Sequence, residues 1–88
     1  MNRTFMLGYY QGVVETAPAV FSAAKTAEFA TAMTVQHLRH ANVSTSDIHD
    51  FLINDAHVSP RIVAQYISLS AAELEAAQAK MMQLAFRV

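Results

Sequence analysis

The sequence predicts an all-α protein, a small bundle of four to five helices that assembles as a homo-oligomer. Glycine and proline occur only twice each, which argues against a protein built from sheets and turns. Alanine accounts for 16 of the 88 residues, as expected where helices pack closely. Hydrophobic residues make up 53% of the chain and charged residues only 15%, and this apolar surplus favours self-association.

The first two helices are expected in the N-terminal half. Between Phe5 and Val14, large apolar residues recur at helical spacing. Pro18 is expected to begin the second helix, because proline is tolerated in a first turn, and this helix should run to about Ala41. The segment 42–44 predicts a break.

Serine residues mark three later helix starts. The segment Ser44–Asp47 resembles a capping box, Ser59-Pro60 combines an N-cap with proline at the first helical position, and Ser70–Glu73 is a complete capping box. The residues expected to face the core, or in the last helix either the core or a partner, are Ile48, Phe51, Leu52, Ala56, Ile62, Val63, Tyr66, Ile67, Leu74, Ala77, Met81, Leu84 and Val88.

Size, charge and hydropathy limit the possible partners. We expect a single domain over residues 1–88, which at this length gains stability from association. The net charge is −1 and the cations are scattered, so coating of nucleic acid is not expected. No apolar run approaches the roughly 18–20 residues of a membrane span. The segment before Ala17–Ala19 is a poor signal sequence, so a cytoplasmic location is expected.

Catalytic and metal-binding patterns are not recognisable. The chain has no cysteine and no Gly-x-Ser-x-Gly element, so we expect neither an enzyme nor a cofactor. His37 and His40 would share a helix face, but their spacing is not a zinc signature. We therefore expect all four histidines at the surface and no metal site.

Two constellations could bind a small anionic ligand. Tyr9 and Tyr10 diverge by about 100° on a helix, so one exposed tyrosine could stack on a base while Lys25 covers it or neutralises a phosphate. The alternative is ordinary interface tyrosines and a lysine that extends along the surface. Ser59 and Arg61 flank a helix N-terminus, which could hold a phosphate, or they could simply be an N-cap and a solvated arginine.

Together these residues resemble a family of small helical phage proteins that sequester cyclic oligonucleotides and so counter the bacterial anti-phage signalling system CBASS. Tyr10 and Lys25 match the residues with which that family clasps cyclic dinucleotides, and Gln11 and Thr26 are placed to assist, although Ala27 could occupy the position of Thr26. Ser59 and Arg61 match its contacts to cyclic trinucleotides. The resemblance implies a non-enzymatic sponge, a homohexamer, acting in the host cytoplasm if the chain is encoded by a phage.

Two alternatives remain. The apolar surplus and the stripe of the last helix would also suit a helical module that inhibits a host protein. The stretch Asp47–Ile67 partly matches a DNA-binding helix-turn-helix. Two positions depart from the motif, because Ile53 replaces the small residue that it usually needs and His57 replaces the usual glycine of its turn. The second helix also has only one cation, Arg61. A plain helical hairpin is therefore expected instead. The motif's apolar positions are occupied by Leu52, Ala56, Val58, Val63 and Tyr66.

Overall fold

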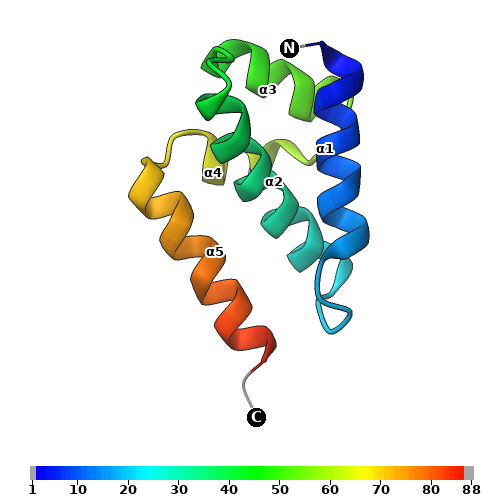
Figure 1. Ribbon diagram of the computed structural model, residues 1–88, viewed down its shortest axis with the longest axis vertical. Coiled ribbons are helices and arrows are strands. Elements are labelled where there is room, and N and C mark those ends of the chain that lie inside the picture. Colours follow the sequence, from blue (N-terminus) through cyan, green and yellow to red (C-terminus); the bar gives the residue numbers. More distant parts are fainter. Residues whose placement is uncertain (1, 87–88) are drawn as a thin grey trace.

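The computed structural model describes residues 2–86, and within them it contains helices and no strand (Figure 1). The predicted all-α class is confirmed, at the upper end of the expected number of helices. The five helices are α1 (Arg3–Thr16), α2 (Ala23–His40), α3 (Thr45–Asn54), α4 (Pro60–Ile67) and α5 (Ala71–Ala85).

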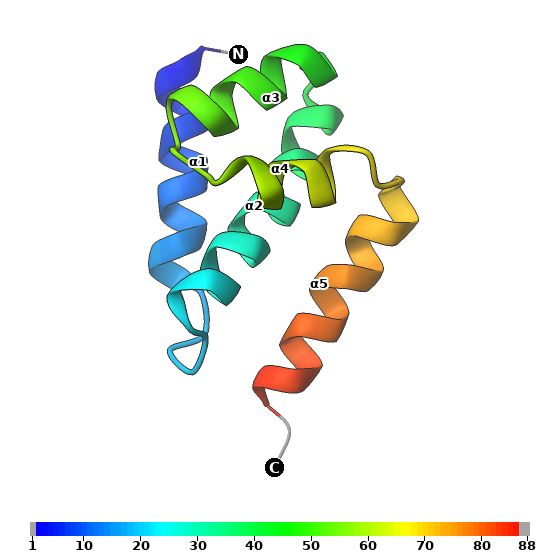
Figure 2. The same ribbon diagram turned by 180° about the vertical axis from the view of Figure 1, so that it is seen from behind.

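The long helix α2 forms the centre of the bundle. It packs against each of the other four helices, with α1 on one side and α5 on the other (Figures 1 and 2). Val35 and Leu38 of α2, together with Phe51 of α3, are fully buried where these helices meet. Because one helix contacts all the others, the short helices α3 and α4 are held against a long common support.

The three predicted serine caps are all confirmed. The Ser44 hydroxyl accepts the amide of Asp47 at 3.1 Å, and the Ser59 hydroxyl accepts the amide of Ile62 at 3.3 Å. At the start of α5, Ser70 accepts the Glu73 amide at 3.1 Å and the Glu73 carboxylate accepts the Ser70 amide at 2.9 Å. Each cap satisfies donors that the first turn of a helix leaves unpaired.

The capping box of α5 makes stability depend on pH. Hydrogen bonds from Ser70 hold the pKa of Glu73 below its ordinary value of 4.5, although the carboxylate is fully exposed. The ionised form therefore adds stability above pH 4.5, and this contribution disappears as the pH falls through the lowered pKa. We expect the stability difference between the wild type and Glu73→Gln, measured by urea denaturation, to be present at neutral pH and to vanish in acid. A difference that persisted in acid would contradict this.

The predicted start of the second helix at Pro18 is wrong. The Pro18 carbonyl accepts the amide of Phe21 at 3.0 Å in a turn, and α2 begins only at Ala23. Ser22 is the N-cap, because its hydroxyl accepts the amide of Lys25 at 3.1 Å. A serine can satisfy a first-turn amide and proline cannot, so the serine determines where the helix starts.

The last helix uses only part of its predicted stripe for the core of the bundle. Leu74 and Met81 are buried against α2, whereas Leu84 is 53% exposed. Val88 lies outside the described residues. Within residues 2–86, no helix is both long and apolar enough to span a membrane.

Candidate functional site

The two adjacent tyrosines of α1 are both engaged within the bundle. Tyr10 lies on the buried face of α1 with Met6 and Val13 and is only 9% exposed, so the expectation that it offers an exposed stacking surface is not met. Burial raises the pKa of its phenol. The reason is helix phase, because the apolar stripe of α1 that faces α2 includes position 10.

Tyr9 is half-buried and stacks on His37 of α2. The ring centroids are 4.0 Å apart and the planes differ by 5°. This pair is not predictable from the sequence, since nothing in the spacing of the two residues indicates that α1 and α2 pack together at this level. Gln11, the predicted assistant of Tyr10, is exposed on α1.

Lys25 lies in the first turn of α2 and lines two adjoining hollows. One, of about 370 Å³, lies between the loop before α2 and the end of α5. The other, of about 390 Å³, lies between α2, α4 and α5 and also includes Lys80. The ammonium group of Lys25 pairs with the Glu28 carboxylate at 3.1 Å, which offsets much of its charge. Volumes of several hundred Å³ are typical of small-molecule sites.

The other predicted residues do not line these hollows. Thr26 is half-buried on α2, as is its alternative Ala27. Ser59 and Arg61 lie at the start of α4, where both are exposed. Pro60 has no amide hydrogen and the Ile62 amide is bonded to Ser59, so the backbone offers an anion little beyond the amide of Arg61. The phosphate site predicted here therefore depends on the Arg61 guanidinium.

The connection between α3 and α4 has the backbone of a sharp turn. His57 adopts a left-handed conformation with φ 57°, a region that residues other than glycine rarely occupy. The Val58 amide donates to the Leu52 carbonyl at 2.9 Å and closes the turn. Although His57 replaces the expected glycine, it takes the conformation for which glycine is normally chosen.

The burial of the side chains around this turn partly matches the pattern of a helix-turn-helix. The apolar positions that the motif buries are less than 10% exposed, apart from Ala56, which is half-buried; the others are Leu52, Val58, Val63 and Tyr66. Ile53, in place of the small residue, is half-buried at the edge. Arg61, Ala64 and Gln65 lie on the exposed face of α4, which is the face that enters a DNA groove in this motif.

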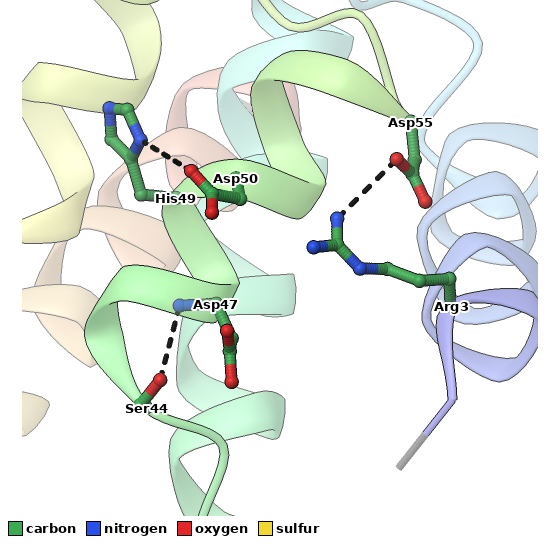
Figure 3. A network of polar contacts seen from close by, with 6 residues as sticks. All are labelled: Arg3, Ser44, Asp47, His49, Asp50 and Asp55. Carbon is green, nitrogen blue, oxygen red and sulfur yellow. Dashed lines mark hydrogen bonds and ion pairs between the residues drawn. The ribbon is translucent and has the colours of Figure 1, made fainter.

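Acidic residues lie on α3 and at its C-terminal end. Figure 3 shows Asp47 held by the Ser44 cap, Asp50 at 3.8 Å from the Nδ1 atom of His49, and Asp55 at 3.4 Å from the Arg3 guanidinium. These are separate contacts, and among residues 2–86 no group of three or more His, Asp or Glu side chains is placed to hold a metal ion. The exposed carboxylates of Asp47 and Asp50 oppose the approach of a phosphate backbone to α3.

Arg39 is a structural residue that sequence analysis missed. Its guanidinium donates to the backbone carbonyls of Ile67 and Leu69, which lie where α4 ends and the chain turns into α5. The partners are main-chain atoms about 30 residues away, so no pattern of residue types could reveal them. Because its guanidinium is engaged by these carbonyls, Arg39 is not available to bind a ligand.

Comparison with known protein families, curated proteins and solved structures finds no match for this chain.

Proposed function

We propose that the chain is a non-enzymatic binding protein that contacts duplex DNA through the helix-turn-helix formed by α3 and α4. The observation that carries this proposal is that two helices joined by the left-handed turn at His57 have buried and exposed positions that largely follow the motif. The low net charge argues against coating of DNA, but sequence-specific recognition needs only a few contacts from one helix.

The recognition face would be the outer side of α4. Arg61 can donate to guanine or to a phosphate, and Gln65, one turn later on the same exposed face, can bond adenine. The carboxylates on α3 reduce the electrostatic attraction that most DNA-binding domains have. Affinity would therefore depend on Arg61 more than in a basic domain, and would be weak for a single copy.

Selection from a randomised duplex pool, followed by fluorescence anisotropy on the selected duplex, tests this proposal. Arg61→Ala should weaken binding by about 1–3 kcal/mol, as expected for loss of one base or phosphate contact. Lys25→Ala is the matched control, because it removes the same charge from the first turn of α2 rather than from the helix proposed to enter the groove, and it should leave DNA binding unchanged. Failure to enrich any sequence at low salt, or equal loss in both variants, would contradict the proposal.

Sequestration of cyclic oligonucleotides is the second candidate, favoured by the position of Lys25 between the two hollows. Because Tyr10 is buried, a base would have to rest on the apolar walls of these hollows. Titration of the same variants with cyclic di- and trinucleotides distinguishes the two functions. A sponge loses dinucleotide binding in Lys25→Ala, releases its ligand unchanged and shows no sequence preference for DNA.

A further inference from the structure

Three of the five large apolar side chains that are exposed among residues 2–86 lie at one end of the molecule. Val20 in the loop before α2 is 71% exposed, and Leu84 and Phe86 at the end of α5 are 53% and 66% exposed. Both segments lie at the lower end of the longest axis in Figures 1 and 2. We call this surface the apolar end, and it consists of Val20, Phe21, Leu84 and Phe86, with the buried Met81 lining the hollows between them.

The apolar end contains projections and hollows side by side. Leu84 lines both of the hollows that contain Lys25, and a third that it shares with Phe86 and Lys80. In a contact between two copies related by a twofold axis, the same patch serves both subunits and must be complementary to itself. A surface that carries both the projecting side chains and the hollows meets that requirement.

The size of this end suits a dimer. A stable interface buries about 800 Å² per partner, roughly one seventh of the 5262 Å² surface of this chain. The two short dimensions of the molecule are 24 and 22 Å between Cα atoms, so an end-to-end contact that also fills the hollows can reach this area.

Charges at the two edges of this end are complementary. Glu15 lies in the last turn of α1 and Lys80 lies on α5, and α1 and α5 are on opposite sides of α2 (Figure 2). Both residues are exposed, and neither belongs to an ion pair formed among residues 2–86. A twofold axis across the end, perpendicular to the line from α1 to α5, brings the α1 edge of each copy over the α5 edge of the other.

We propose that the apolar end is the interface at which a second copy of this chain docks, with Glu15 of each copy facing Lys80 of the other. This goes beyond the DNA-binding proposal and does not depend on it. It assigns the expected self-association to one surface.

Sedimentation equilibrium of the 88-residue chain tests the proposal without any ligand. The wild type should be a dimer at micromolar concentrations, and both Leu84→Asp and Val20→Asp should be monomers with unchanged helix content. Phe5→Asp is the matched control, because Phe5 is 69% exposed in the first turn of α1 at the opposite end, and this variant should remain a dimer. Since Val20 lies outside every helix, its substitution cannot act through helix stability.

A charge exchange tests the orientation. Glu15→Lys and Lys80→Glu should each weaken the dimer about threefold to tenfold, as expected for two exposed charge pairs, and the double variant should regain wild-type affinity. A wild-type monomer at all concentrations, an assembly that Leu84→Asp leaves intact, or dissociation of Phe5→Asp would overturn the interface. Failure of the double variant to recover would overturn the orientation.

Discussion

Replacement of Phe51 by alanine is expected to lower the free energy of unfolding by about 4 kcal/mol. Phe51 is among the largest fully buried side chains, and it lies on α3 where this helix packs against α2 and α4. Its removal forfeits the burial of an aromatic ring and leaves a cavity that the rigid neighbouring helices cannot close. Since domains are typically stable by only about 5–15 kcal/mol, the variant would be close to unfolding at room temperature.

Urea denaturation followed by circular dichroism measures this loss. Phe5→Ala provides the comparison, because the same substitution at an exposed position should change stability by no more than about 0.5 kcal/mol. If the two variants were equally stable, the packing of α3 in the core would be wrong. If the proposed binding of DNA exists, it should disappear in Phe51→Ala in parallel with the folded fraction.

Substitution of Arg39 should produce the second-largest effect. Arg39→Met is expected to cost about 2–4 kcal/mol, because it removes two charge-assisted hydrogen bonds and leaves the Ile67 and Leu69 carbonyls without these donors. Arg39→Lys should recover part of this loss, since an ammonium group can reach a carbonyl but lacks the planar fork that joins two of them.

The loss of stability in Arg39→Met should be concentrated in α5. In hydrogen exchange, amides of α5 should lose more protection than those of α3, because Arg39 fixes the turn that leads from α4 into α5. Arg3→Met is the control: its pair with Asp55 is exposed, at 3.4 Å, and its removal should cost at most about 1 kcal/mol. Equal losses for Arg39→Met and Arg3→Met would show that the two arginine contacts are equivalent.

Local chemistry made much of the fold predictable. Three helix starts are predictable from their N-cap serines, Ser44, Ser59 and Ser70. Each serine hydroxyl accepts a hydrogen bond from a backbone amide only three residues later, so the signal is local. The start of the second helix was wrongly placed at Pro18 because another local signal lies nearby. Ser22 caps the helix with its hydroxyl, and the helix begins after it. The number of helices and most of the core therefore follow from short-range patterns.

The candidate site was harder to predict because it depends on how helices turn toward each other. The choice between Tyr9 and Tyr10 is a choice of helix phase, because a rotation of α1 by about 100° would exchange the buried ring for the half-buried one. The left-handed conformation of His57 could not be expected from a residue that seldom adopts it. Lys25 and Lys80 share a hollow only because α2 and α5 are antiparallel neighbours.

The attachment of α5 to the bundle, chiefly through α2, has a consequence for the lifetime of the protein. A helix with one main neighbour can open at a lower free energy than the whole domain, and its opening exposes an unfolded segment to proteases while the other helices stay folded. Turnover would then follow the opening of this one helix rather than global unfolding. The protein would then be degraded quickly even while α3 and α4 remain folded. Any contact that covers α5 would slow this degradation.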